Sequence, residues 1–103
     1  MKKTRIYISG PISGYDLDER RKTFRQVANY LSILGYEPVN PFDNSLPQPG
    51  DYEQHMRADI EELLSCDCIY LLQGWEKSRG SRLELDIAVA CGIDVRHEIR
   101  LDL

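Results

Sequence analysis

The sequence predicts an α/β domain with a short parallel sheet, because segments typical of strands alternate with segments typical of helices. The run from Cys68 to Leu72 is continuously apolar, as expected for a central parallel strand that is covered on both faces. A length of 103 residues fits one core. We therefore expect residues 1–103 to form a single domain.

The first half of the chain contains two strand signals around one helix signal. Residues 5–8 are apolar and end at a Gly-Pro break, which predicts a strand feeding a turn. Residues 37–39 form a brief extended segment, because Asn40 precedes a proline and so avoids the helical region. Between them, residues 16–34 have apolar side chains at helical spacing, and Gly35 is placed to end the helix.

The second half repeats this alternation. Turn-forming residues predict a loop over 42–50, and Asp51 with Gln54 resembles a capping box for a helix that ends near Ser65. A polar loop follows the central strand. Ser81 and Glu84 form an S-x-x-E pair, which predicts that a well-buried third helix begins there and ends before Gly92. Residues 93–99 then supply an edge strand.

Charge and cysteine content limit the classes of partner. The formal net charge is −4 and basic residues are spread among acids, which argues against binding a nucleic-acid polymer. No apolar run approaches the roughly 20 residues of a membrane span, so we expect no membrane partner. Three cysteines fit a reduced, cytoplasmic setting. Cys66 and Cys68 would share one face of a strand; buried thiols are favoured over a metal site completed by a histidine, and we expect no metal.

Small molecules are therefore the expected ligands, and the fold class indicates where they bind. Parallel sheets bind ligands at the carboxyl ends of their strands, where the winding direction reverses. This places the functional loops at residues 9–13, 41–51 and 73–81. The first of them, within YISGPISG, offers free backbone N–H groups to a phosphate or hydroxyl, although an ordinary strand-to-helix turn has the same appearance.

Two carboxylates admit both a structural and a chemical interpretation. Asp59 lies beside the apolar stripe of its helix, so it is either partly buried or a solvated helix acid. Glu84 stands where a glutamate commonly reaches back to a capping residue, here Ser81. Spacing alone favours the capping interpretation of Glu84.

Three segments together resemble the nucleoside 2-deoxyribosyltransferase superfamily, over nearly the whole chain. They are YISGP at 7–11, DIEELLSCDCIYLL at 59–72 and SRGSRLELDIAVACG at 78–92. The resemblance is greatest to small phage and bacterial members, which are related to 2′-deoxynucleoside 5′-phosphate N-hydrolases. We accordingly expect a flavodoxin-like, doubly wound three-layer sandwich whose four- to five-stranded parallel sheet has the strand order 2-1-3-4.

The resemblance also implies roles for individual residues. Glu84 matches the glutamate that attacks the anomeric carbon, Asp59 matches the aspartate that contacts the leaving base, and Tyr7 matches the tyrosine that holds the nucleophile. Gly10 would let the sugar approach the backbone, and Ser78 would hold a 5′-phosphate. Arg79 and Arg82 offer forked donors to a phosphate. The expected substrate-binding residues are Ser9, Gly10, Pro11, Ile12, Ser78, Gly80 and Arg82.

The implied activity is cleavage or transfer at the N-glycosidic bond of 2′-deoxyribonucleosides or their 5′-monophosphates, through a glutamate glycosyl-enzyme intermediate and without a cofactor. Glu84 would stay charged at the positive end of its helix, and partial burial would raise the pKa of Asp59. A nucleotide-binding or sensing module of the same fold, without turnover, is the alternative. A scaffold that binds no ligand is a third possibility.

The same resemblance implies shared sites between subunits, so we expect a homo-oligomer, with a dimer as the first choice. The family delivers an asparagine or serine from its C-terminal tail into the neighbouring site. Here residues 95–103 form a shorter tail that contains no asparagine.

Overall fold

The computed structural model describes residues 2–47 and 50–99. Within them, one parallel sheet has the order β2-β1-β3-β4, which confirms the predicted architecture and strand order. The end of the C-terminal tail, residues 100–103, lies outside the described residues. The strands are β1 (Arg5–Ser9), β2 (Glu37–Val39), β3 (Cys68–Leu71) and β4 (Asp94–His97), with β4 at the predicted edge.

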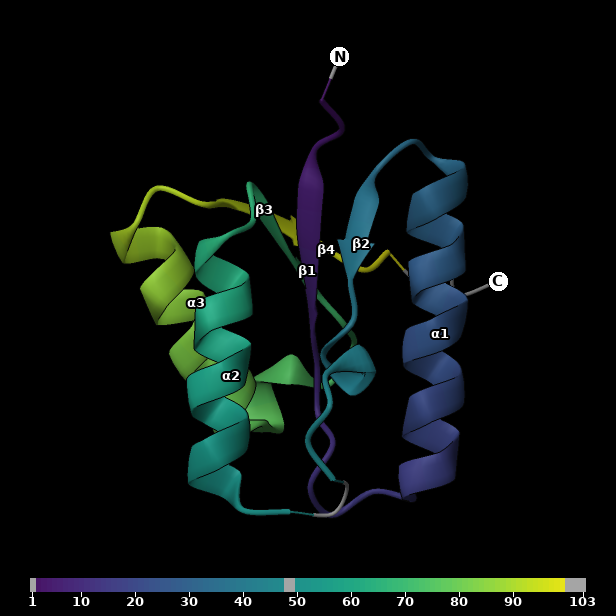
Figure 1. Ribbon diagram of the computed structural model, residues 1–103, viewed down its shortest axis with the longest axis vertical. Coiled ribbons are helices and arrows are strands. Elements are labelled where there is room, and N and C mark those ends of the chain that lie inside the picture. Colours follow the sequence, from purple (N-terminus) through teal and green to yellow (C-terminus); the bar gives the residue numbers. More distant parts are fainter. Residues whose placement is uncertain (1, 48–49, 100–103) are drawn as a thin grey trace.

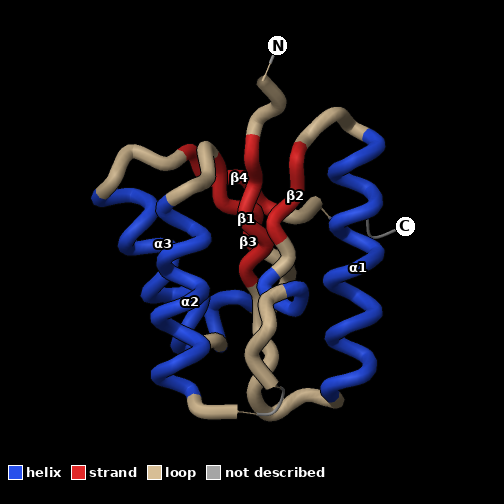
Figure 2. The backbone as a smooth tube through the Cα atoms, viewed as in Figure 1, coloured by secondary structure: helices blue, strands red, loops and turns tan. Residues whose placement is uncertain are grey.

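Helices cover both faces of this sheet and make three layers. Helix α1 (Leu17–Ile33) lies on one face, and α2 (Tyr52–Leu64) and α3 (Arg79–Ala90) lie together on the other (Figure 1). Short 3-10 turns, η1 (Pro41–Asp43) and η2 (Trp75–Lys77), follow β2 and β3 (Figure 2). No helix of the described ranges is both long and apolar enough to cross a membrane.

Alternation along β1 divides the core into two layers. Ile6 and Ile8 pack toward α1, where they meet Phe24 and Leu31. Tyr7 points to the opposite face. Because side chains alternate along a strand, Ser9 also belongs to the face that carries α2 and α3. The second core layer contains Tyr7, Leu63, Cys66, Ile69, Leu71 and Ala88.

The two cysteines of the S-C-D-C segment do not share a face. Cys66 packs in the layer under α2 and α3, whereas Cys68 packs in the layer under α1. The prediction that they share a face is therefore wrong, because Cys66 precedes β3 and does not follow its alternation. Both thiols are buried and free, and no group of three His, Cys, Asp or Glu residues within the described ranges could hold a metal.

Helix α3 begins earlier than its S-x-x-E pair predicts. Its N-cap is Ser78, whose hydroxyl accepts a hydrogen bond from the Ser81 N–H at 3.2 Å. Glu84 consequently lies in the second turn and is not a capping residue. The helix is also less buried than its apolar sequence indicates, because only one face meets the sheet and α2. Leu83 and Val89 on its other sides are 44% and 65% exposed.

Adjacent leucines near the end of α2 provide a matched test of this packing. Leu63 is fully buried, whereas Leu64 is 54% exposed. We expect Leu63→Ala to lower the free energy of unfolding by about 2–5 kcal/mol, because it leaves a cavity between α2 and the sheet. Leu64→Ala is expected to change it by less than about 0.5 kcal/mol. Urea denaturation measures both, and equal losses would contradict the packing described.

Candidate active site

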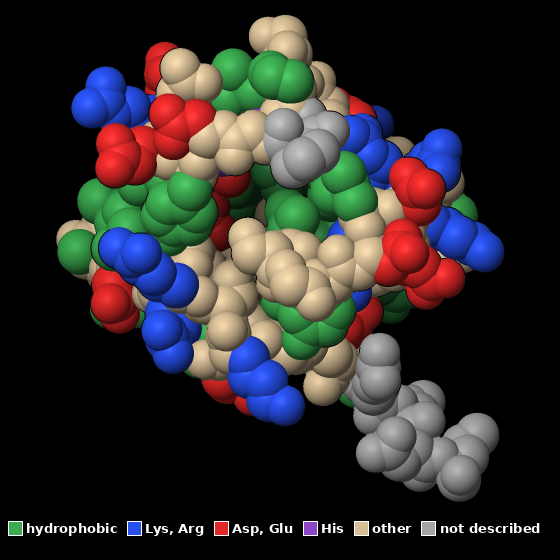
Figure 3. Space-filling view, turned by 90° about the horizontal axis from the view of Figure 1, so that it is seen from below, with side chains coloured by type: hydrophobic (Ala, Val, Ile, Leu, Met, Phe, Trp, Pro, Cys, Tyr) green, Lys and Arg blue, Asp and Glu red, His purple; other side chains and the backbone are tan. Residues whose placement is uncertain are grey.

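A cavity of about 640 Å³ opens at the carboxyl ends of the strands. The molecule is visibly hollowed at this end, with acidic atoms inside the hollow and basic side chains on parts of its rim (Figure 3). The end of β1, the loop that follows it, and the N-terminal halves of α2 and α3 form the walls. Among its lining residues are Tyr7, Ser9, Gly10, Pro11, Ile12, Asp59, Ser78, Gly80 and Glu84.

Glu84 is a buried and hydrogen-bonded side chain of this cavity. It is only 5% exposed, and both of its carboxylate oxygens accept hydrogen bonds. The Tyr7 hydroxyl donates to Oε2 at 2.8 Å, and the Ser9 hydroxyl donates to Oε1 at 2.7 Å. The carboxyl group is therefore turned toward the sheet. The interpretation in which Glu84 reaches back to cap its own helix is wrong.

Two periodicities bring these groups together. Tyr7 and Ser9 are two residues apart on β1, so their side chains share the face that α3 covers. Ser81 and Glu84 are three residues apart on α3, so they share the helix face that meets β1. The hydroxyls of Ser9 and Ser81 consequently lie 3.0 Å apart.

Burial raises the pKa of Glu84 to about 7, although the hydrogen bonds from Ser9 and Tyr7 oppose the shift. The sequence predicted a charged Glu84 at the positive end of its helix. The predicted cause is wrong, because Glu84 lies beyond the first turn, where the helix dipole has little effect; the hydrogen bonds from Tyr7 and Ser9 stabilise its charged form instead. The pKa of Tyr7 is raised well above its usual range, by burial first and then by the charge of Glu84. Tyr7 is therefore a hydrogen-bond donor at neutral pH.

Asp59 faces the same cavity from α2. It is half-buried, and within the described residues its Oδ1 atom is buried without a hydrogen-bond partner. Burial, followed by the charges of Glu84 and Glu62, raises its pKa to about 8. The interpretation of Asp59 as an ordinary solvated acid is thus wrong. The geometry places one carboxyl that is readily protonated and one that is held by two donors around a common space.

The other predicted binding residues divide into two groups. Pro11, Ile12, Ser78 and Gly80 line the cavity. Arg82 does not: it is exposed, and its guanidinium donates to the Glu76 carbonyl at 3.3 Å.

Gly10 lines the cavity, but it also has a packing reason to be glycine. A Cβ atom there would lie 2.9 Å from the Leu72 Cβ, too close for a real contact.

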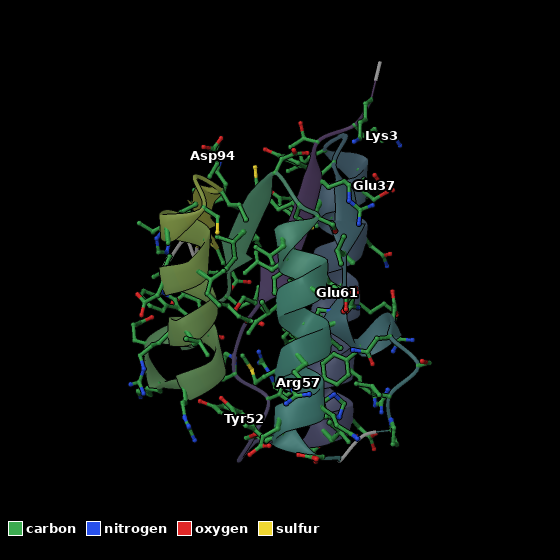
Figure 4. All side chains as sticks on the ribbon, turned by 60° about the vertical axis from the view of Figure 1, so that its left-hand side comes forward. Lys3, Glu37, Tyr52, Arg57, Glu61 and Asp94 are labelled. Atoms are coloured by element: carbon green, nitrogen blue, oxygen red, sulfur yellow. The ribbon has the colours of Figure 1, made fainter. Side chains whose placement is uncertain are left out.

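Two cavity residues on α2, Tyr52 and His55, were not predicted from the sequence, whereas Arg79 was predicted as a donor to a phosphate. Tyr52 and Arg79 form one part of the rim, where the Arg79 guanidinium lies 5.3 Å from the centre of the Tyr52 ring. Tyr52 lies at the lower end of α2 in Figure 4. His55 contributes to the wall and lies 2.9 Å from the Pro47 carbonyl through its Nε2 atom. The helical register places Tyr52, Met56 and Asp59 on the side of α2 that lines the cavity, so helical spacing is the sequence signal that indicates Tyr52.

The fold and this carboxylate-lined cavity define an α/β domain of the kind that binds small polar ligands at the ends of its strands. The chain belongs to the DUF4406 family, described as a domain of unknown function, whose model matches residues 4–97. Among curated proteins, none matches the chain by sequence.

Solved structures share this fold. The 2-deoxyribosyltransferase of Bacillus psychrosaccharolyticus is 22% identical with a TM-score of 0.69, over 95% of this chain and 77% of that one. The Leishmania mexicana 2-deoxyribosyltransferase is 22% identical with a TM-score of 0.71, over 91% and 63%. The CMP N-glycosidase of Clostridium botulinum is 21% identical with a TM-score of 0.61, over 91% and 67%. The family resemblance predicted from the sequence is confirmed at the level of the fold.

The raised pKa of Asp59 predicts a specific dependence of stability on pH. The folded protein binds this proton more tightly than the unfolded chain, whose aspartate titrates near 3.8, so the contribution of Asp59 to stability is lost as the pH rises toward about 8. The difference in the free energy of unfolding, Asp59→Asn minus the unchanged protein, should therefore increase from pH 3.8 to about pH 8 and stay constant at higher pH. Urea denaturation across this range measures the difference. A difference that decreases with pH would contradict the assigned environment of Asp59.

Proposed function

We propose that the chain cleaves or transfers the N-glycosidic bond of 2′-deoxyribonucleosides or their 5′-monophosphates, with Glu84 as nucleophile, Asp59 as acid and Tyr7 as the group that orients Glu84. The observation that carries this proposal is the Glu84 carboxylate, held by Tyr7 and Ser9 in the cavity that Asp59 also faces. The resemblance in sequence supports the same roles. Two of the similar structures are 2-deoxyribosyltransferases and one is a CMP N-glycosidase, which agrees with chemistry at this bond.

The order of the two raised pKa values supports this division of roles. Because the pKa of Asp59, about 8, lies above that of Glu84, about 7, a single proton held by the two acids resides mainly on Asp59 between these two pH values. Glu84 is then ionised and can attack the anomeric carbon, while Asp59 can protonate the leaving base. A pair of acids with separated pKa values is the usual arrangement for this division of roles.

The proposed reaction proceeds in two displacements. A Glu84 oxygen bonds to C1′ as the bond from C1′ to the base nitrogen breaks, and the base takes that electron pair together with the proton of Asp59. Water, or the nitrogen of a second base, then bonds to C1′ and releases the Glu84 carboxylate. The proton of the incoming group passes to Asp59, which restores the starting state.

The rim next to α3 supports a 5′-phosphate as part of the substrate. Lys77, Ser78 and Arg79 line the cavity at this point, and they supply two cationic groups and a hydroxyl. The Ser78 hydroxyl accepts from the Ser81 N–H and keeps its own proton for donation. Monophosphates are accordingly the substrates to examine first.

Release of free base tests the proposal. With a panel of deoxynucleosides and their 5′-monophosphates, Glu84→Gln should lower the rate of base release by about 10³-fold or more, since it removes the nucleophile. Glu61→Gln is the matched control, because Glu61 is exposed on α2 (Figure 4). It should leave the rate unchanged. Ligand-induced thermal stabilisation without base release would instead support the binding module without turnover.

The two raised pKa values also predict the shape of the pH–rate profile. The proposed activity requires ionised Glu84 and protonated Asp59, so kcat/KM should fall below about pH 7 and above about pH 8. Asp59→Asn should remove the alkaline limb and lower the maximum by about 10²–10⁴-fold. A profile that is flat from pH 5 to 9 would contradict these roles.

A further inference from the structure

The hydroxyl pair formed by Ser9 and Ser81 is a buried polar feature that the proposed reaction does not explain. Ser9 is 1% exposed and Ser81 is 2% exposed, and they come from different elements, β1 and α3. A serine that closes a strand and one in the first turn of a helix would ordinarily be solvated or replaced by an apolar residue. Here each has a hydrogen-bond partner in the protein.

When Glu84 is ionised, the proton count fixes the direction of this chain of hydrogen bonds. An ionised carboxylate only accepts, so the single proton of the Ser9 hydroxyl is donated to Glu84 Oε1, at 2.7 Å. The contact of 3.0 Å between Ser9 and Ser81 must then be made by the proton of Ser81. Ser81 thus donates to Ser9, and Ser9 donates to Glu84.

We propose that Ser81 is a positioning residue, which acts through Ser9 to orient the Glu84 carboxylate and to strengthen the hydrogen bond that stabilises its ionised form. This inference deepens the proposed function and rests on it where catalysis is concerned. Ser81 itself does not contact Glu84 by any hydrogen bond of the described structure; its effect is transmitted by the Ser9 hydroxyl.

The physical basis is polarisation along the chain. A hydroxyl that accepts a hydrogen bond becomes a stronger donor, and the effect is larger in a buried site than in water. Without Ser81, the Ser9 hydroxyl would lose one partner and could rotate about its Cβ–Oγ bond. Since Tyr7 holds only Oε2, Oε1 would then depend on a Ser9 hydroxyl that is a weaker and less firmly oriented donor.

A double-mutant cycle of Ser9→Ala and Ser81→Ala, with the pKa of Glu84 as the measured quantity, tests this inference directly. The side-chain carboxyl carbon of Glu84 is followed by ¹³C NMR during a pH titration. Ser9→Ala should raise the pKa of Glu84 by about one to two units, because it removes a donor to the charged form. Ser81→Ala should raise it by about half a unit, and it should add nothing in the Ser9→Ala background.

Ser32→Ala is the control, because Ser32 is exposed on α1, on the opposite face of the sheet. It should leave the titration of Glu84 unchanged. An unchanged Glu84 titration in Ser81→Ala, or shifts that add in the double variant, would overturn the inference. Should Ser81→Ala not fold, Ser81→Cys preserves a side chain of similar shape with a weaker donor. It must raise the pKa of Glu84 by a smaller amount, and no rise would equally overturn the inference.

Turnover separates this inference from the proposed function. With a substrate that releases base, Ser81→Ala should lower kcat about fivefold at pH 6 with KM unchanged, and displace the acidic limb of the profile upward. An altered KM with an unmoved limb would indicate a merely structural role. If no substrate releases base, the proposed function fails, whereas the NMR cycle still decides whether Ser81 acts through Ser9.

Discussion

The burial of the Glu84 carboxylate against β1 is the constraint on which the rest of the site depends. A carboxylate that is 5% exposed is unfavourable unless its oxygens are satisfied, and the Tyr7 and Ser9 hydroxyls satisfy both of them. Residual desolvation still raises its pKa. The protein therefore holds a group that is oriented by two donors and yet is close to protonation at neutral pH.

This arrangement follows from the way the fold presents β1. The strand lies between β2 and β3, so its backbone is fixed on both sides and its alternation assigns Ile6 and Ile8 to one core layer. The polar pair Tyr7 and Ser9 is thereby left facing α3. Asp59 reaches the same space from α2, where burial first and then the charge of Glu84 raise its pKa above that of Glu84. The alternation of side chains along β1 thus helps to determine which polar groups surround Glu84 and therefore its pKa.

Much of the fold could be predicted from the sequence, because strands and helices have different periodicities. The apolar spacing in α1, the uninterrupted run of β3 and the glycine that ends α1 all specified their elements locally. The start of α3 was misplaced because either Ser78 or Ser81 can cap a helix; in the structure Ser78 is the N-cap, and the Ser81 side chain lies against Ser9 instead. Cys66 was assigned to the wrong face because alternation does not extend beyond the end of a strand.

The site was predictable to a lesser degree. The roles of Glu84 and Asp59 came from family resemblance, since spacing alone favoured a helix cap and a solvated acid. The Ser81 hydroxyl and the Tyr52–Arg79 contact depend on how α2 and α3 meet β1, which no local pattern encodes. Arg82 is the opposite case: the sequence predicted it as a binding residue, but its side chain does not line the cavity and contacts the Glu76 carbonyl instead.

The proposed roles require that Glu84, which is buried, and Asp59, which is half-buried, share one proton near neutral pH. Titration of both carboxyl carbons by ¹³C NMR in the unliganded protein measures this most directly. The structure predicts two transitions, at about 7 and about 8, with Asp59 the last of the two to lose its proton. Transitions of both groups below pH 5 would show that the two carboxyls are solvated and independent, and would contradict the account.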